Sequence, residues 1–268
     1  MTANKFGKIY HIPVCPFCQR LQILLNLKGC EDSIEFIVVD ITVPRAEWLL
    51  EKTGGSTALP IFELTNGKVV KESLVIMRLI DELIPDRPVA ARDPYLHALE
   101  GMMEKFDDNF TFSGYMWVMN QDAEKKTSFE EKTLKQYKTL NDFLVQHNPS
   151  GTFLLEEFGW VEAIYTPIFQ RFWFLEYFED FSLPDTPEYA RVKKWIVACL
   201  AHPAAQQANR DEIIKLYYDY AKGAGNGKLL PCREKSSFSF EPHWRERPLP
   251  PRDKYTGLAA SDSDLGLL

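Results

Sequence analysis

The chain has 268 residues, 45 % apolar and 26 % charged, an ordinary globular composition with room for two domains. Its formal net charge of -7 excludes a global basic field for nucleic acid, and no apolar run approaches the roughly 20 residues that span a bilayer. The polar start, Met1 to Gly7, contains no signal-peptide stretch. Five irregularly spaced cysteines do not resemble a disulfide scaffold. We therefore expect a cytoplasmic protein, with cleaved organelle targeting before residue 1 left open.

The first part of the chain alternates between strand-like and helix-like patterns. Strand patterns recur at residues 8–12, 34–40, 60–64 and 68–71, and helical patterns at 19–27, 48–52 and 73–83. The continuous apolar run 34–40 predicts a strand buried on both faces, and Asn66-Gly67 predicts a two-residue hairpin turn. The order β-α-β-α-β-β-α is that of the thioredoxin fold. We predict an α/β thioredoxin-like domain over residues 1–86.

A proline-rich linker at 85–94 separates this domain from a long helical region. Amphipathic stretches without a strand pattern predict a second, all-α domain over residues 93–225. Aromatic side chains crowd the stretch 160–181. They indicate a helix buried on most sides, while the alternative is a helix with one face lining an apolar pocket near the first domain.

The last part of the chain, residues 226–268, is rich in proline and charge and should form an extended tail. It also holds four aromatic residues, Phe238, Phe240, Trp244 and Tyr255. They favour a tail anchored along the protein surface over simple disorder. Only the last dozen residues are expected to be disordered.

The sharpest local motif is Cys15-Pro16-Phe17-Cys18, between a predicted strand and a predicted helix. Cys15 should be the helix N-cap, with Pro16 at the first helical position. Free backbone N–H groups and the positive end of the helix dipole would then favour a thiolate at Cys15. Cys18 lies one turn further on the same face, where a disulfide with Cys15 is sterically plausible and a resolving role is suitable.

Two other interpretations of the motif are weaker. Structural zinc needs a second pair of ligands, and the chain has no other C-x-x-C and only scattered histidines, so we expect no metal site. The other alternative to a reactive pair is two unreactive, structural cysteines at a helix start. The strand–CxxC–helix context favours redox chemistry instead.

Two further places in the first domain suit a glutathione molecule. In the thioredoxin topology the Leu59-Pro60 bond is expected to be cis and to face the active cysteine, leaving the backbone of Leu59 free to pair with an extended peptide. Ser73 is expected to cap the following helix and to form an anion site with its free N–H groups. Glu72 beside it suits an ammonium group. Together the pair matches the γ-glutamyl end of glutathione.

These features resemble the cytosolic glutathione transferases, above all the cysteine-type classes such as omega and lambda, over about residues 7 to 225. The matching pieces, in order and at family spacing, are Cys15-Pro16-Phe17-Cys18, Arg45-Ala46-Glu47-Trp48, Ala58-Leu59-Pro60 and Glu72-Ser73. The resemblance implies glutathione as a substrate, a homodimer, and an open apolar site between the domains for a small apolar or disulfide co-substrate.

The resemblance also implies roles for single residues. Cys15 would form a mixed disulfide with glutathione, which Cys18 or a second glutathione would release. The glutathione itself would be held by Phe17, Arg45, Leu59, Pro60, Glu72 and Ser73. Weak candidates for the acceptor site are Tyr115, Trp117 and Trp173. Omega-type members usually carry alanine at the position of Cys18, so this motif is closer to that of glutaredoxins.

The resulting hypothesis is a glutathione-dependent thiol transferase or reductase, acting in deglutathionylation or in reduction of dehydroascorbate or glutathionyl-quinones. The alternative is a non-catalytic carrier of an apolar ligand on the same scaffold. A third possibility is an interaction module that uses the proline-rich tail for docking.

Overall fold

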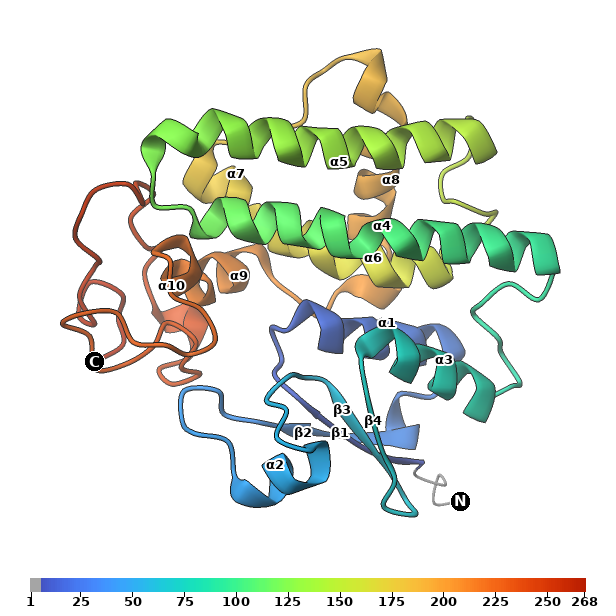
Figure 1. Cartoon of the computed structure of the whole chain (residues 1–268), viewed down its shortest axis with the longest axis horizontal. Coiled ribbons are helices and arrows are strands. Elements are labelled where there is room, and N and C mark those ends of the chain that lie inside the picture. Colours follow the sequence, from blue (N-terminus) through green and yellow to red (C-terminus); the bar gives the residue numbers. More distant parts are fainter. Residues whose placement is uncertain (1–5) are drawn as a thin grey trace.

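The structure is a computed structural model that describes residues 6–268 (Figure 1). The expectation that Met1 to Gly7 contains no signal peptide therefore falls largely outside the described residues. A small sheet with its helices forms one part of the molecule, a helical bundle stacks on it, and the tail lies beside both. The fold is the expected one: a thioredoxin-like domain followed by an all-helical domain.

The sheet has the strand order β2-β1-β3-β4. Its strands are β1 Gly7–His11, β2 Ile34–Val38, β3 Ile61–Leu64 and β4 Val69–Lys71. β1 runs parallel to β2 and antiparallel to β3, and β3 and β4 form an antiparallel hairpin. The predicted element order of the first domain is confirmed.

Two expectations about these strands are wrong in detail. β2 is not buried on both faces, because it is the edge strand of the sheet and Val38 is 53 % exposed. The hairpin loop is longer than two residues, because the hydrogen bond that closes it joins the N–H of Leu64 to the carbonyl of Lys68. Gly67 takes the left-handed conformation in this loop, with φ of 80°.

Helices cover both faces of the sheet, and the alternation of side chains along the strands explains how. Ile9 and Phe62 point into the main core together with residues of α1 (Pro16–Lys28) and α3 (Ser73–Leu83). Their neighbours Tyr10 and Ile61 point to the other face. There they pack against Leu49 of α2 (Glu47–Thr53).

The start of α3 differs from the expectation. Glu72, with φ of 69°, is the N-cap residue, and Ser73 is already the first helical position. The side chain of Glu72 makes no capping hydrogen bond to this helix start. The Ser73 hydroxyl instead accepts a hydrogen bond from Nη1 of Arg20 at 3.1 Å. The N-terminus of α3 is therefore left open for another acceptor.

The second domain is a helical bundle centred on α6. Its helices are α4 Pro94–Met119, α5 Lys126–His147, α6 Trp160–Arg171, α7 Trp173–Glu179, α8 Pro187–Ala201, α9 Arg210–Leu216 and α10 Tyr218–Ala221. Every residue of α6 is buried, and α6 packs against α1 of the first domain. The aromatic stretch 160–181 is therefore core, as the first of the two interpretations predicts.

The tail packs against the bundle beside α9 and α10 (Figure 1). Within residues 226–268, the regular structure is a single turn of 3-10 helix at Trp244–Glu246. The expected anchoring is confirmed, but the expected disorder of the last dozen residues is wrong. Leu267 is fully buried, and Asp262 forms a buried ion pair with Arg233. A sequence-local argument cannot find such a distant partner.

Candidate functional site

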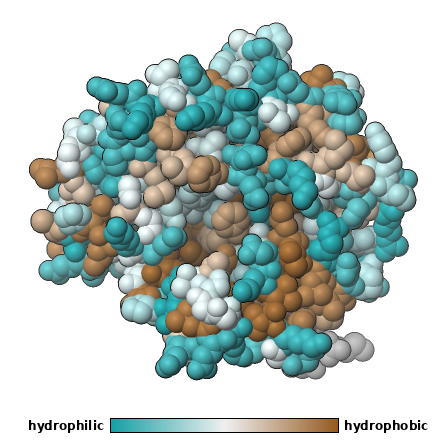
Figure 2. Space-filling view, viewed as in Figure 1, coloured by the Kyte–Doolittle hydropathy of each residue, from teal (hydrophilic) through white to brown (hydrophobic). Residues whose placement is uncertain are grey.

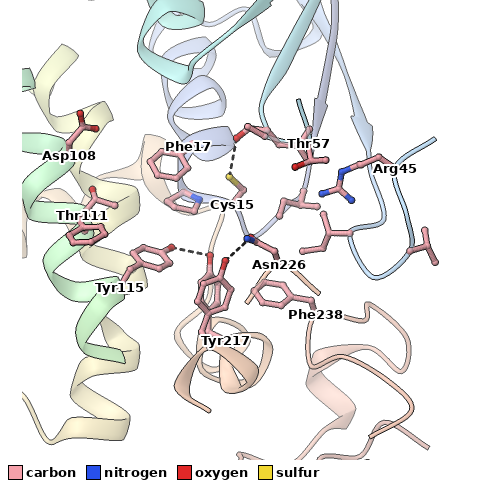
Figure 3. A pocket seen from close by; sticks show the side chains of 18 of the residues that line it. Cys15, Phe17, Arg45, Thr57, Asp108, Thr111, Tyr115, Tyr217, Asn226 and Phe238 are labelled. Atoms are coloured by element: carbon pink, nitrogen blue, oxygen red, sulfur yellow. Dashed lines mark hydrogen bonds between the residues drawn. The ribbon is translucent and has the colours of Figure 1, made fainter. Parts of the chain in front are cut away.

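Cys15 lies between β1 and α1, and its backbone is fixed by the start of α1. Cys15 is the N-cap of α1, with extended backbone angles, and Pro16 occupies the first helical position. The carbonyl of Cys15 accepts the first helical hydrogen bond, from the N–H of Gln19 at 3.0 Å. The side chain of Cys15 is 7 % exposed, and its Sγ lies 4.0 Å from the carbonyl oxygen of Leu59 (Figure 3).

The surroundings of Cys15 favour its thiolate, although burial alone would oppose ionisation. Hydrogen bonds from the side chain and backbone of Cys18, the positive charge of Arg171 and the backbone of Phe17 outweigh that burial and lower the pKa of Cys15. Cys18 is fully buried, and burial together with its hydrogen bond to Cys15 raises the pKa of Cys18 well above its usual value. The pair therefore consists of Cys15, whose thiolate form is favoured, and a Cys18 thiol that donates to it.

A cavity of about 900 Å³ opens in front of Cys15. On the first-domain side it is lined by Phe17 of α1, by Arg45 from the loop before α2, and by residues 57–59. The Leu59-Pro60 bond is cis, as predicted. Figure 3 shows the Arg45 guanidinium on the same side as Thr57, and Nε of Arg45 is buried with no hydrogen-bond partner among residues 6–268. This wall therefore carries a nucleophile, a carbonyl 4.0 Å from its sulfur and a cation.

Three tyrosines lie on the helical-domain wall of the cavity, which is also lined by Asp108, Asn109, Thr111 and Phe112 of α4. Tyr217 donates a hydrogen bond to the carbonyl of Val14 at 2.8 Å, and Tyr115 donates to Tyr217 at 3.3 Å (Figure 3). Burial raises the pKa of both hydroxyls, so they remain protonated donors. Tyr220 completes this wall and donates to Oδ1 of Asn226 at 2.9 Å.

The tail supplies a third wall. Phe238 is 2 % exposed, lines the cavity, and packs against Tyr217 and Tyr220 with ring centroids 5.1 and 5.5 Å apart. Gly227 has φ of 75° and lies against the loop that leads to Arg45, where a Cβ would come within 2.3 Å of the Ile41 carbonyl oxygen. The tail thus touches both domains at the mouth of the site.

The three acceptor-site candidates from the sequence are scattered. Tyr115 lines the cavity. Trp117, on the same helix, is fully buried in the core and packs against Phe181, with ring centroids 5.1 Å apart. Trp173 packs at the edge of the core and does not line the cavity. An α-helix turns by about 100° per residue, so Tyr115 and Trp117 face different directions.

The glutathione-site candidates lie around one corner of the cavity. Phe17, Arg45 and Leu59 line it directly. Ser73 lies beyond them and is connected through Arg20, which hydrogen-bonds to Ser73 and stacks on the Phe17 ring at 5.0 Å from its centroid. Pro60 is buried behind Leu59, and the side chain of Glu72 is exposed at the start of α3.

Sequence reasoning missed several residues of the site. Among them are the cavity residues Tyr217, Tyr220, Asn226 and Phe238, and the buried Arg171, whose charge acts on Cys15. One signal for Arg171 was present: a single cation inside the apolar, aromatic run Ile168 to Phe174. A cation in a run of that kind must find acceptors in the interior. The tail residues had no such signal, because their neighbours are set by tertiary packing.

Two other classes of site were checked against the described part of the chain. Within residues 6–268, no three His, Cys, Asp or Glu side chains gather as they would around a metal ion. None of the helices in this range combines the length and the apolar character that a bilayer crossing requires.

The architecture defines a class of protein: a thioredoxin-like domain with a cysteine at the start of its first helix, closed by a helical domain. Comparisons with known proteins specify the family. The family described as "Glutathione S-transferase, N-terminal domain" matches residues 9–88. A protein of Glycine max named probable glutathione S-transferase is 30 % identical over 203 residues, which are 73 % of this chain and 84 % of that protein.

One further relative is similar in sequence, and one solved structure is similar in fold. Glutathione S-transferase omega-1 of Sus scrofa is 24 % identical over 198 residues, 74 % of this chain and 78 % of its own length. The crystal structure of Chlamydomonas reinhardtii dehydroascorbate reductase is similar with a TM-score of 0.61 at 19 % identity, covering 81 % of this chain and 99 % of that one. The chain belongs to the glutathione S-transferases, a family of enzymes that bind glutathione.

Proposed function

We propose that this protein is a glutathione-dependent thiol transferase or reductase in which Cys15 forms a mixed disulfide with glutathione. The observation that carries the proposal is the state of Cys15: a buried, helix-capping cysteine with a lowered pKa at the base of a large cavity. Transferases that conjugate glutathione to electrophiles need a hydroxyl that stabilises the thiolate of glutathione. A thiolate in that place attacks disulfides instead.

For a glutathionylated thiol, the reaction balances as two thiol–disulfide exchanges. The Cys15 thiolate attacks the glutathionyl sulfur of the mixed disulfide, which forms a Cys15–glutathione disulfide and releases the partner as a thiolate. A second glutathione thiolate then attacks the glutathionyl sulfur of that adduct, oxidised glutathione leaves, and the Cys15 thiolate is restored. In the alternative second step Cys18, whose thiol donates a hydrogen bond to Cys15, attacks the Cys15 sulfur and expels glutathione as a thiolate. Two glutathione molecules then reduce the Cys15–Cys18 disulfide and leave as oxidised glutathione.

The proposed glutathione site uses the first-domain wall. An extended glutathione pairs with the backbone of Leu59, the cis bond after it keeping those groups free. Arg45 binds the glycyl carboxylate, since its Nε has no hydrogen-bond partner in the part of the chain that the structure describes. The uncapped start of α3 at Ser73 binds the γ-glutamyl carboxylate, and Glu72 binds the ammonium group. Phe17 and Pro60 shape the floor beside the thiol.

The co-substrate occupies the other side of the cavity. The apolar and aromatic surface of Tyr115, Tyr217, Tyr220 and Phe238 suits a small apolar group or an aromatic ring attached to the reacting sulfur. Glutathionylated thiols, dehydroascorbate and glutathionyl-quinones are the substrates proposed for this pocket.

The structure offers little support for the two rival functions. A carrier with vestigial glutathione binding has no use for a thiolate-favouring environment at Cys15. A free docking tail is not observed, because Pro250 is buried and its carbonyl accepts a hydrogen bond from Tyr177 at 2.6 Å.

The decisive experiment is the intact mass of the reduced protein after incubation with oxidised glutathione. We expect one glutathione on the wild type and on Cys18→Ser, and none on Cys15→Ser. A wild type that instead loses two hydrogens would show that Cys18 resolves the adduct. A wild type that gains nothing, or a Cys15→Ser variant modified equally well, would overturn the proposal in favour of the carrier.

A homodimer is also proposed, on the basis of the family resemblance. Apolar side chains are exposed on neighbouring helices, among them Val75 of α3 at 54 % and Met102 of α4 at 49 %. Figure 2 shows apolar surface gathered where α3 lies below α4. Light scattering on the eluted protein should give twice the chain mass of 31.0 kDa. The variant Val75→Glu should shift it towards the single-chain mass.

A further inference from the structure

Arg171, the last residue of α6, is a fully buried cation that reaches from the helical domain into the active-site loop. Its Nε and Nη2 both donate to the carbonyl oxygen of Val14, at 3.0 and 2.8 Å. Nη1 donates to the side-chain oxygen of Gln19 in the first turn of α1, and to the carbonyl of Pro167 at 3.3 Å. Arg171 therefore forms hydrogen bonds with residues that precede and follow Cys15 in the chain.

Every one of these acceptors is uncharged. Two other interior arginines, Arg20 and Arg233, have carboxylate partners in Asp107 and Asp262. Arg171 takes part in none of the ion pairs formed within residues 6–268. The hydrogen bonds satisfy its donors, but they do not balance its charge. A buried charge without a counter-charge is costly, because little solvent remains to screen it.

Cys15 is the residue that directly follows the Val14 carbonyl in the chain. Other titratable groups at this corner are the thiol of Cys18, the hydroxyls of Tyr115, Tyr217 and Tyr220, and the carboxyl of Glu212, and the cavity in front of Cys15 is also lined by Arg45 and Asp108. The first four are held in their neutral forms by burial.

Glu212 does not neutralise Arg171 directly. Its carboxyl accepts from the backbone N–H of Asn209 at 3.5 Å. Burial raises the pKa of Glu212, while the positive charge of Arg171 acts in the opposite direction. The charge of Arg171 also acts on the Cys15 sulfur and helps to lower its pKa.

We propose that Arg171 is a positioning residue for Cys15. Its guanidinium fixes the Val14 carbonyl, and with it the loop that presents the sulfur, and it supplies the buried positive charge that balances the Cys15 thiolate. The proposal rests on the proposed function, in which that thiolate is the nucleophile. It assigns the helical domain a part in the chemistry of the thioredoxin-like domain.

The same charge acts in both halves of the exchange. In the first half it stabilises the attacking thiolate of free enzyme. In the second half a glutathione thiolate attacks the glutathionyl sulfur of the adduct, the Cys15–sulfur bond breaks, and its electron pair returns to the Cys15 sulfur. A thiolate of lower basicity leaves faster, so Arg171 promotes the release step.

The test compares three full-length variants: Arg171→Gln, Arg171→Lys and Arg191→Gln. Arg191 is a matched control, because it is also a buried arginine of the helical domain that donates to backbone carbonyls, those of Asn148, Thr152 and Phe153. The measurement is the rate of iodoacetamide alkylation of the Cys15 peptide, followed by mass spectrometry as a function of pH.

We expect Arg171→Gln to move the midpoint of the alkylation profile up by about one pH unit or more, which is about a tenfold slower reaction near pH 6. Arg171→Lys keeps the charge, so its midpoint should lie close to that of the wild type. The loss of the two hydrogen bonds to the Val14 carbonyl should still slow glutathione turnover. Arg191→Gln should leave the profile unchanged. A folded Arg171→Gln protein with the wild-type midpoint would overturn the proposal.

A second measurement on the wild type covers the case in which Arg171→Gln does not fold. Between about 0.1 and 1 M sodium chloride the screening length falls from about 10 to about 3 Å. A buried counter-charge is hardly screened, so the Cys15 midpoint should stay in place. A midpoint that rises strongly with salt would show that an exposed charge holds the thiolate, against the proposal.

The outcomes separate this inference from the proposed function. Should the wild type gain no glutathione while Arg171→Gln still moves the alkylation midpoint, the thiol transferase function fails and the role of Arg171 stands. Should the wild type form the adduct while Arg171→Gln keeps the wild-type alkylation midpoint, the function stands and this inference fails.

Discussion

The thioredoxin-like domain and the carboxyl-terminal tail form two walls of one cavity, yet different interactions hold them in place. The first domain is a hydrogen-bonded sheet with apolar clusters on both faces. The tail, residues 226–268, has one turn of 3-10 helix and is fixed by long cationic side chains. A segment with almost no regular secondary structure can therefore still form a well-positioned wall of a site.

Lys254 shows how this works. It is fully buried, and its Nζ donates to the carbonyls of Trp117 and Val118 at 2.9 and 2.8 Å. These carbonyls lie in the last turn of α4, where the Trp117 carbonyl also accepts from the N–H of Asn120 at 3.0 Å. The same Nζ pairs with Glu179 at 2.5 Å. One tail residue thus caps one helix and neutralises a carboxylate on another.

The largest effect should come from removing such an anchor. Arg233 pairs with Asp219 of α10 at 3.5 Å and with Asp262, and it donates to the carbonyls of Lys235 and Ala260 at 2.9 and 3.2 Å. Arg233→Met would leave two buried carboxylates without their cation. We expect the free energy of unfolding, measured by urea titration of tryptophan fluorescence, to fall by about 3–5 kcal/mol.

The matched control for Arg233 is Arg252, a tail cation whose pair with Asp180 is exposed. Arg252→Met should cost under about 1 kcal/mol, since solvent screens that pair. Equal losses in the two variants would mean that burial of the Arg233 pairs does not anchor the tail.

The first domain should differ from the tail in its response to acid. His11 of β1 is 4 % exposed and packs edge-on against Phe36, and burial lowers its pKa to about 4. The unfolded chain binds this proton near pH 6.5, so the native state is favoured above that pH and loses stability as the pH falls towards 4. The full contribution is about 3 kcal/mol.

The measurement is the difference in unfolding free energy between wild type and His11→Phe at about pH 6.5 and pH 4.5, so that carboxylates common to both cancel. The wild type should lose more stability than the variant over this window. His243→Phe, at an exposed tail position, should behave as the wild type does. The prediction fails if wild type and His11→Phe lose the same amount.

The sequence predicted structure correctly where it depends on interactions between residues close together in the chain, and less well where it depends on distant partners. The first-domain elements could be read because their signals are local: Gly29 ends α1 in the left-handed conformation with φ of 62°, and Cys15 and Pro16 mark its start. The burial of β2 was misjudged, because a strand's place at the sheet edge depends on partners elsewhere in the chain.

The tail and the helical wall of the site show the limit of local reasoning. Arg233 and Asp262 are 29 residues apart, and Arg171 and Val14 are 157 residues apart. No spacing rule connects such pairs. Cys15 was identifiable because a helix N-terminus activates it locally, whereas its cationic partner comes from another domain.

Within the cavity, the first-domain wall should determine the affinity for glutathione. Arg45→Gln removes the cation proposed to bind the glycyl carboxylate, a charge-assisted hydrogen bond of about 1.5–3 kcal/mol. The KM for glutathione should rise by about tenfold or more, with kcat within about twofold. Lys68→Gln, on the exposed hairpin, is the control. An unchanged KM, or a loss confined to kcat, would remove Arg45 from the glutathione site.

The tail wall should instead determine the preference for co-substrate, with a smaller effect. Phe238→Leu keeps an apolar side chain but removes the ring that faces the cavity beside Tyr217. An aromatic contact is worth about 0.5–1.5 kcal/mol, so kcat/KM for the mixed disulfide of glutathione with benzyl mercaptan should fall by about two- to tenfold. The mixed disulfide with 2-mercaptoethanol, which has no ring, should react as before.

Phe240 provides the control for this last comparison, because it is an aromatic of the same tail segment that packs against the core and does not line the cavity. Phe240→Leu should leave the ratio of the two kcat/KM values unchanged. If Phe238→Leu slows both substrates equally, the tail stabilises the site without selecting its co-substrate. Selectivity would then belong to the helical-domain wall, where the remaining aromatic residues that line the cavity are Phe112, Tyr115, Tyr217 and Tyr220.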